Sequence, residues 1–296
     1  MGSYGRLRQT RESSTDEDSM SDICTRTVTY PTDMSDAEWT SLQPYVDQRL
    51  HLGAPRVVCL RCIINALFYM NRTGCQWEML PRDFPPFSTV YWYFKKWREN
   101  GTWKRMNDDL RRKVRLGFEK SDEPSAAIID SQSVKTTEIG GEDIGFDANK
   151  KVTGRKRHIA VDTMGLLLMV VVTAASIQDA NSAKHIGPRM RGHFPNLKKI
   201  WVDAGYKEQF IAWFKEQCGW IVEVVTRRDG AVGFEVQPHR WIVERTFGWF
   251  NLFRRLSKDY DYHPETSEAM IYLASIRLMV RRLAPSIDQE LLEANC

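Results

Sequence analysis

Three carboxylates stand where the sequence could place catalytic acids. Asp130 ends the apolar run 126–130, Asp203 ends the run 199–203, and Glu244 lies among arginines in a stretch with helical periodicity. Three carboxylates in one cleft repel one another unless cations neutralise them. Mg²⁺ takes hard oxygen ligands of this kind, and a pair of ions can activate a nucleophile and stabilise a leaving oxygen. The pattern therefore favours metal-dependent phosphoryl transfer on nucleic acid.

Other acids compete for this role. Asp162 and Asp179 also flank expected strands, and three more acids, Glu138, Glu142 and Asp143, follow Asp130 in the chain. Asp162 ranks lower because it occupies a hairpin corner, where Asp is favoured simply as a turn residue. Glu244 also has a plainer alternative, an i,i+4 ion pair with Arg240 on a solvated helix face.

The stretch 240–256 is expected to form one helix with two chemically distinct faces. At about 100° per residue, six apolar residues share one side: Trp241, Ile242, Trp249, Leu252, Phe253 and Leu256. The opposite side carries a narrow polar stripe of Arg240, Glu244, Gly248, Asn251, Arg254 and Arg255. Glu244 is thus a lone carboxylate among guanidinium groups, which suits either an ion-pair network or the wall of an active site.

The first part of the chain is expected to be helical. Residues 1–33 are polar, with almost no apolar periodicity, and are interpreted as a disordered leader. Residues 34–118 predict a small all-α, helix-turn-helix-like domain, with helices from Ser35, from Pro55 to about Asn71, over 88–99 and over 102–117. Its basic and aromatic residues favour contact with duplex DNA, mainly through the fourth helix. Residues 119–125 form a linker.

The pattern then changes to strands. Short strands are expected over 126–130, 158–162 and 166–174, with a Gly-rich basic excursion over 131–157 and a tight turn at 163–165. Further on, helices over 178–190 and 207–218 alternate with strands over 199–205 and 220–226. This order predicts an α/β domain over 126–285, with a mixed sheet and helices on both faces, followed by a tail over 286–296.

Composition limits the function classes. The 296 residues carry a net charge of +4 at pH 7 and 42% hydrophobic residues. The longest apolar run, 166–172, is far shorter than the roughly 18 residues of a membrane span. Six scattered cysteines suit a reducing compartment, so a cytoplasmic protein is expected. Basic residues gather in three blocks, 104–120, 150–157 and 254–282, which together favour a polyanionic partner.

Several motifs together resemble the DDE transposases of bacterial insertion sequences, specifically the insertion sequence five family. They are Ile129-Asp-Ser-Gln-Ser-Val-Lys-Thr136, Gly154-Arg-Lys-Arg-His-Ile-Ala-Val-Asp-Thr163, Val202-Asp-Ala-Gly-Tyr206 and Val243-Glu-Arg-Thr-Phe-Gly-Trp249. The stretches Asn65–Tyr69, Arg72–Trp77 and Asp83–Pro86 resemble that family's helical N-terminal domain, so the likeness covers about Met34 to Arg282. It departs from the wider family pattern at two positions: Gln237 stands where Tyr is expected and Asn251 where Lys is expected.

The resemblance implies a ribonuclease-H-like catalytic domain in which Asp130, Asp203 and Glu244 hold Mg²⁺ or Mn²⁺, with two ions expected. It implies that the protein binds the terminal inverted repeats of its element in double-stranded DNA, hydrolyses phosphodiester bonds at the ends, and joins the 3′-hydroxyl ends to target DNA. A dimer or higher oligomer in the cytoplasm, associated with the nucleoid, is expected. Candidate DNA contacts are Lys135, Arg155, Lys156, Arg157, Arg240, Arg254, Arg255, Arg112 and Lys113, with His158 as an auxiliary contact to the scissile phosphate.

Plainer alternatives remain open for these residues and for the whole chain. Each basic residue could be a solvated surface charge, and a His at the start of a strand is more often structural. The chain could instead be a DNA-binding protein without catalysis, or a metal-dependent nuclease that cuts but never joins ends. A carboxylate-pair glycosidase is remote, because three basic blocks serve a neutral sugar poorly.

Overall fold

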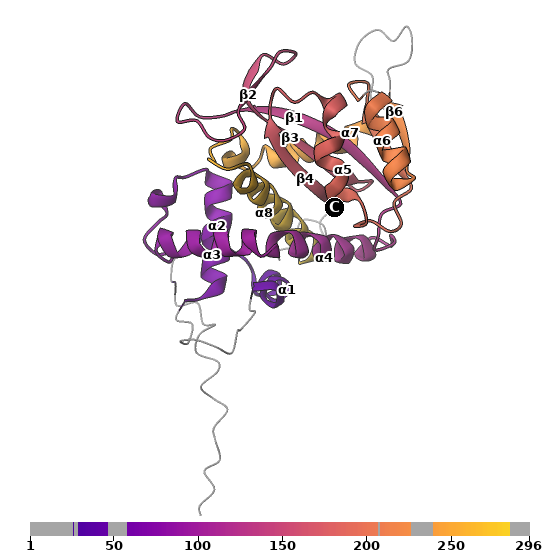
Figure 1. Ribbon diagram of the computed structural model, residues 1–296. Helices are drawn as coiled ribbons and strands as arrows, with labels where there is room; N and C mark the ends of the chain where they lie inside the picture. Colours follow the sequence, from indigo (N-terminus) through magenta and orange to yellow (C-terminus); the bar gives the residue numbers. More distant parts are fainter. Residues whose placement is uncertain (1–25, 27–28, 47–57, 207, 226–238, 285–296) are drawn as a thin grey trace, which may run out of the picture.

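A mixed β-sheet with helices on both faces forms the centre of the molecule (Figure 1). The computed structural model describes residues 26, 29–46, 58–206, 208–225 and 239–284. Within these residues the sheet has six strands: β1 Ala126–Lys135, β2 Gly145–Asp147, β3 Val152–Asp162, β4 Leu167–Ala174, β5 Lys199–Asp203 and β6 Ile221–Val225. Their order is β2-β3-β1-β5-β6, and β4 pairs with β3. The β1–β5 and β5–β6 pairs are parallel, whereas β3 is antiparallel to β1, β2 and β4.

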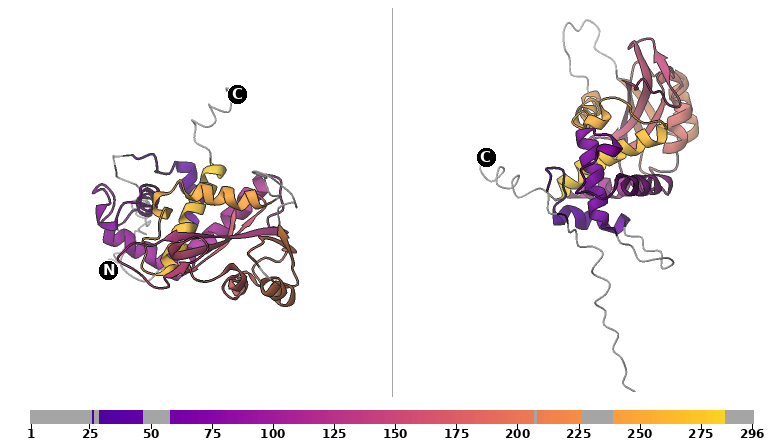
Figure 2. Two further views of the ribbon diagram at one scale, coloured as in Figure 1. Left: turned by 90° about the horizontal axis from the view of Figure 1, so that it is seen from above. Right: turned by 90° about the vertical axis from the view of Figure 1, so that its left-hand side faces the viewer.

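Helices cover both faces of this sheet. The α-helices are α1 Asp36–Val46, α2 Leu60–Thr73, α3 Phe87–Glu99, α4 Thr102–Gly117, α5 Ala183–Met190, α6 Glu208–Cys218, α7 Arg240–Phe250 and α8 Pro264–Leu283. Short 3₁₀ turns are η1 Trp77–Met79, η2 Asp179–Asn181 and η3 Arg254–Leu256. Seen from above in Figure 2, α5 and α6 lie on one side of the sheet, and α8 lies on the other.

Alternation along the strands divides the apolar residues between the two sides of the sheet. On β1, Ala127 and Ile129 pack with Phe210 and Phe214 of α6, whereas Ile128 belongs to the core that contains α7 and α8. The buried strands are nearly continuous apolar runs, because they are covered on both faces. The core that contains α7 and α8 also contains the apolar faces of the N-terminal helices, so the sheet and those helices share one interior.

The long helix α8 joins the N-terminal helices to the sheet. Asn107 of α4 donates from Nδ2 to the Leu167 carbonyl at 2.9 Å and accepts from Ser275 Oγ of α8 at 2.8 Å. Asn71 of α2 donates to the Met270 carbonyl at 3.1 Å. All three contacts are buried, so the helical region is fixed against the sheet by polar bonds as well as by apolar packing.

The expected N-terminal helices are present. Ser35 and Glu38 form a capping box at α1, with the Ser35 amide donating to Glu38 Oε2 and the Glu38 amide donating to Ser35 Oγ. The fourth helix has the predicted bounds, 102–117. The second begins at Leu60 in the structure, and its expected start at Pro55 lies outside the described residues. The helix-turn-helix interpretation and the domain boundaries stay predictions.

Three expected boundaries differ from the structure. The first strand continues to Lys135, and β3 begins at Val152 rather than at His158, because pairing between them extends through Lys135 and Gly154. The helix expected over 240–256 ends at Phe250, and a 3₁₀ turn follows. The buried face of α7 also differs from the expected one, since Trp241 is 44% exposed, and Leu252, beyond the helix, is 53% exposed.

The end of the expected leader is folded. Tyr30 stacks on Phe84 with ring centroids 5.3 Å apart, and its hydroxyl donates to Asp83 Oδ1 at 3.0 Å. Arg26 lies over the same Phe84 ring and forms an ion pair with Asp33. The interpretation of 1–33 as wholly disordered is therefore wrong for these residues; positions 1–25 and the tail over 286–296 lie outside the described part. None of the helices described is long and apolar enough to cross a membrane.

Candidate active site

Asp130 and Asp203 lie on two neighbouring parallel strands, Asp203 as the last residue of β5 and Asp130 in the middle of β1, two residues beyond its last pairing with β5. Ile128 of β1 pairs with Trp201 of β5, and the two aspartates follow each of these residues by two positions. Side chains two apart on a strand point to the same face. Because Ile128 and Trp201 belong to the core that contains α7, both aspartates face that helix.

Glu244 reaches the same region from α7. Arg240 lies between the acids, with Nη2 3.7 Å from Asp203 Oδ2 and Nε 3.1 Å from Glu244 Oε1. The Glu244 side chain is 54% exposed and that of Asp203 is 23% exposed. The three predicted acids are thus brought together around one guanidinium group, and the i,i+4 pair between Arg240 and Glu244 is also present.

Negative potential is concentrated at the strand ends. The pKa of Asp130 is raised to about 6, because burial and the charge of Asp203 raise it by more than the Ser131 amide, Arg240 and Lys150 lower it. The Ser131 amide donates to Asp130 Oδ1 at 2.7 Å. Burial also raises the pKa of the Tyr206 hydroxyl well above its usual value, and Asp130 and other nearby acids add to this. Such a site favours a bound cation.

The donor atoms suit a hard cation, although they are not gathered into a cage. Among the described residues, no three His, Cys, Asp or Glu side chains converge closely enough to hold a metal ion. Asp130, Asp203 and Glu244 offer carboxylate oxygens, which are the ligands that Mg²⁺ prefers. Glu244 would have to exchange Arg240 for the ion, and its exposed side chain leaves room for that movement.

The neighbouring basic residues of β3 point to the opposite face of the sheet or into the interior. Lys156 is buried, with Nζ 3.5 Å from Asp147 Oδ2 and 3.4 Å from Asp179 Oδ1. His158 is fully buried, and its Nε2 lies 3.1 Å from Thr173 Oγ1. Burial lowers the pKa of His158 to about 3, so the ring is neutral. This placement favours the structural alternative and does not fit a contact between His158 and the scissile phosphate.

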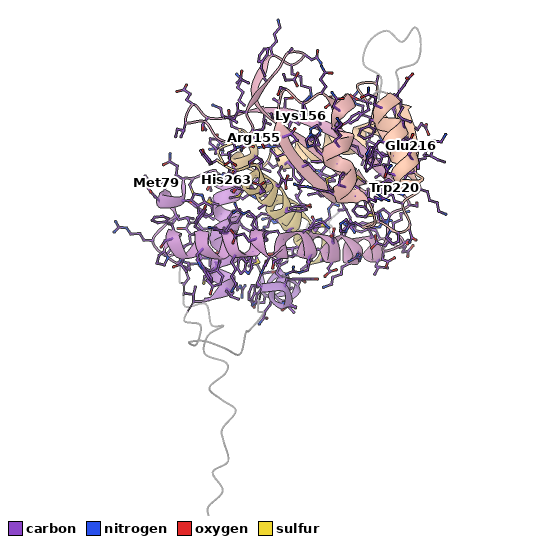
Figure 3. All side chains as sticks on the ribbon, in the orientation of Figure 1. Met79, Arg155, Lys156, Glu216, Trp220 and His263 are labelled. Carbon is purple, nitrogen blue, oxygen red and sulfur yellow. The ribbon has the colours of Figure 1, made fainter. Side chains whose placement is uncertain are left out.

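Arg155 and Arg157 are buried on the α8 side and hold a loop in place. Arg155 donates from Nη1 to Asp259 Oδ1 at 3.0 Å and to the Asp261 carbonyl at 2.7 Å, while Arg157 donates to the Leu256 carbonyl at 2.6 Å. Arg155 and Lys156 occupy adjacent positions on the sheet, as Figure 3 shows.

Arg255 joins the same buried network through Asp261, with Nη2 2.6 Å from Oδ1. The prediction that the β3 residues Arg155, Lys156 and Arg157 line a DNA track, together with Arg255, is therefore corrected. All four are buried, and each is bonded to protein carboxylates or carbonyls. DNA therefore does not reach them in this conformation of the protein.

The other predicted cations are accessible to different degrees. Lys135, Lys113 and Arg254 are exposed, although Lys113 also lies over the Tyr45 ring. Arg112 is only partly exposed and forms ion pairs with Asp109 and Glu123. These positions remain compatible with DNA contact, most directly at Lys135 and Arg254.

Sequence reasoning missed two residues beside the acids. Lys150 lowers the pKa of Asp130 and donates from Nζ to the Ser131 carbonyl at 3.2 Å. Tyr206 is buried, and its hydroxyl lies close enough to Asp130 and Asp203 for their charges to raise its pKa. Lys150 belongs to a basic block that the sequence shows, but its approach to Ser131 depends on how the 136–151 segment folds back, which no local signal reveals.

Comparisons with known families agree with this geometry. A model described as "Transposase DDE domain" matches residues 121–279, more than half of the chain, and one described as "Putative transposase of IS4/5 family" matches residues 34–107. The chain belongs to the DDE-domain transposases of the IS4/5 type, and its catalytic part has the ribonuclease-H-like fold of that domain.

Among individual proteins, the chain resembles the "Putative transposase for insertion sequence element IS402" of Burkholderia cepacia. The two are 28% identical over 127 residues, which is 40% of this chain and 60% of that protein. The chain therefore spans less than two thirds of the length of this relative.

Proposed function

We propose that the protein is a transposase that cuts double-stranded DNA at the ends of its element and joins the freed 3′-hydroxyl ends to target DNA. The observation that carries this proposal is the meeting of Asp130, Asp203 and Glu244 from two parallel strands and a facing helix, around Arg240. Membership of the DDE-domain family supports it. Terminal inverted repeats are the expected substrate, and a dimer that holds two ends together is the expected assembly.

Each side chain has a definite part in this proposal. Asp130 and Asp203 would hold divalent metal from the strand ends, and Glu244 would complete the ligand set after turning away from Arg240. Bound Mg²⁺ or Mn²⁺, in two ions, would activate the attacking oxygen and neutralise charge on the leaving oxygen. Arg240, once released by Glu244, keeps its position 3.7 Å from Asp203 and can pair with a phosphate oxygen.

The test is cleavage of labelled duplex DNA that carries the element's own terminal repeats, with Mg²⁺ or with chelator. Glu244→Gln keeps the size of the side chain and removes its charge, and Glu216→Gln on the exposed face of α6 is the matched control (Figure 3). We expect metal-dependent nicking at the repeat boundary by the wild type and the control, and a loss of at least about a hundredfold in Glu244→Gln. DNA binding should change little.

Two results would overturn the proposal. Cleavage by Glu244→Gln at the wild-type rate would show that Glu244 is not catalytic and serves only in a surface ion pair with Arg240. Tight binding by the wild type without cleavage under either metal would make the chain a DNA-binding protein that lacks catalysis. A joined product with a target plasmid separates a transposase from a nuclease, which would release cut ends only.

A further inference from the structure

A strip of exposed and half-buried aromatic and basic side chains continues around α7 from Glu244. At about 100° per residue, Gly248 lies about 40° around the helix from Glu244, Trp241 about 60°, Arg245 about 100° and Trp249 about 140°. A Cβ at Gly248 would meet no heavy atom within 4 Å, so the helix surface is open there. The strip therefore begins at the candidate active site and has no gap along the helix.

Guanidinium groups and indole rings alternate along this strip. The Arg245 guanidinium carbon is 4.7 Å from the Trp241 ring centroid and 4.6 Å from that of Trp249. Arg282 of α8 lies on Trp249 as well, at 4.6 Å. We call these four residues, Trp241, Arg245, Trp249 and Arg282, the α7 ladder. Trp241, at the end next to Glu244, is 44% exposed.

Within the described part of the chain, neither arginine of the ladder has an ion-pair partner. No described Asp or Glu lies within 4 Å of Arg245 or Arg282, whereas Arg155, Arg189 and Arg255 each have such a partner. The Arg245 Nε is buried and has no hydrogen-bond partner, and Nη2 donates to the Met164 carbonyl at 3.0 Å. Burial and the like charge of Arg245 lower the pKa of Arg282, against the charge of Asp162, which raises it from beyond ion-pair distance.

Two guanidinium groups that share one indole ring repel each other, and an anion between or beside them removes that cost. Indole rings add a surface on which a nucleotide base can stack, worth about 1–3 kcal/mol per base. Arginine is also the side chain best suited to phosphate, because its planar donors bind two oxygens at once. Cations, aromatic rings and an open helix surface next to catalytic acids together match the chemistry of nucleic acid.

We propose that the α7 ladder receives the DNA strand that flanks the scissile phosphate, with Arg245 and Arg282 on backbone phosphates and Trp241 against a base or sugar. Gly248 lets the strand pass close to the helix between Glu244 and the ladder. This inference rests on the proposed function, since the ligand is the DNA that the acids cut. The expected DNA contacts thus move from the buried cations of β3 to side chains of α7 and α8.

The first test measures how DNA binding depends on salt, in chelator, so that no cleavage occurs. Arg245→Met and Arg282→Met keep an unbranched side chain and remove the charge, and Lys215→Met on the exposed side of α6 is the matched control. Each phosphate contact contributes about 0.9 to the slope of log affinity against log salt. We expect the slope to fall by about 1 in each single variant and by about 2 in the double variant, with no change in the control.

A purely structural ladder would give the opposite pattern. The free double variant loses the Met164 hydrogen bond and the contacts with both indole rings as well as a like-charge repulsion, so its resistance to urea is measured separately from the salt slopes. Unchanged salt slopes with a clear loss of stability would overturn the inference, since they would show that the ladder only packs α7 against α8. Unchanged slopes with an altered sedimentation state would assign the strip to a second copy of the chain, which also overturns it.

Gly248→Leu provides a second, independent test. The site is open and exposed, and Leu is a better helix former than Gly by nearly 1 kcal/mol, so the variant should fold at least as well as the wild type. If DNA runs past Gly248, the added side chain should weaken binding and cleavage about tenfold or more. Wild-type binding and cleavage by Gly248→Leu would refute a strand on this surface.

The outcomes separate this inference from the proposed function. If the wild type cuts repeat DNA and the ladder variants bind and cut equally well, the proposed function stands and the α7 ladder is not a DNA-binding surface. A wild-type protein that binds without cutting, with reduced salt slopes in the variants, would keep the ladder as a DNA-binding surface and remove the catalytic proposal.

Discussion

Replacing Asp130 with Asn should make the metal-free protein more stable while abolishing cleavage. Asp130 is partly buried in the middle of β1, and its charged form is disfavoured by burial and by Asp203. Asn is close in size and cannot ionise, and its Oδ1 can still accept the Ser131 amide that Asp130 accepts at 2.7 Å. The substitution therefore removes an unfavourable charge and keeps the local hydrogen bond.

The size of the effect follows from the pKa. Folding raises the Asp130 pKa from its ordinary 3.8 to about 6. A shift of about 2 units corresponds to about 3 kcal/mol at about 1.36 kcal/mol per unit. Because the folded protein binds the proton more tightly, stability is highest below pH 4 and is lost as pH rises to about 6. Asp130→Asn lacks this loss, so its advantage should be near zero at pH 4 and about 3 kcal/mol at pH 8.

Urea unfolding of the two proteins in chelator, at pH 4, 6 and 8, measures the difference directly. Other titrating groups are common to both chains and cancel in the comparison. Added Mg²⁺ should stabilise the wild type and have less effect on Asp130→Asn, because the ion binds the folded state only. An advantage that does not change with pH, or a variant that is less stable at pH 8, would refute the reasoning and make Asp130 an ordinary structural acid.

Two further substitutions test how the interior is held together, again by urea unfolding. Arg155→Met should cost about 3–5 kcal/mol, because it leaves Asp259 buried without the cation 3.0 Å away; a loss below about 1 kcal/mol would show that Asp259 does not depend on this pair. Asn107→Leu should cost about 2–3 kcal/mol through two buried hydrogen bonds, to Leu167 and from Ser275. A neutral result there would mean that α8 and the sheet do not need Asn107 as a link.

Features governed by local chemistry could be predicted from the sequence. The helix over 102–117 has apolar residues at helical spacing, starts after Asn100-Gly101 and lies where it was expected. Asp162 was assigned to a hairpin corner, and its Oδ1 accepts the amides of Met164 and Leu166 there. Both predictions depend on residues within one turn or one helix of each other, so little tertiary information was needed.

Features that depend on distant partners could not be predicted. The acids that pair with the β3 arginines lie about a hundred residues further along the chain, and the sequence around Arg155 does not predict this pairing. Because β3 begins six residues before its expected start, at Val152, the basic block became part of a central strand rather than of a surface loop. The C-terminal helix α8, which was not anticipated as an element, supplies much of the cover over these residues.

The candidate site shows the same division. The sequence placed Asp130 and Asp203 at strand ends and Glu244 on a helix. In the structure Asp203 and Glu244 both lie within 4 Å of Arg240 and Asp130 lies on the neighbouring strand, and their catalytic role stays a prediction. It did not reveal which cations stand near them, because a cluster in the sequence becomes a patch on the surface only if its strand or helix is exposed. The β3 arginines hold loops onto the sheet, whereas Arg245 and Arg282, which are far apart in the sequence, share the Trp249 indole on the helix that carries Glu244. Charge without a protein partner is therefore the better guide to a DNA surface in this protein than the density of basic residues.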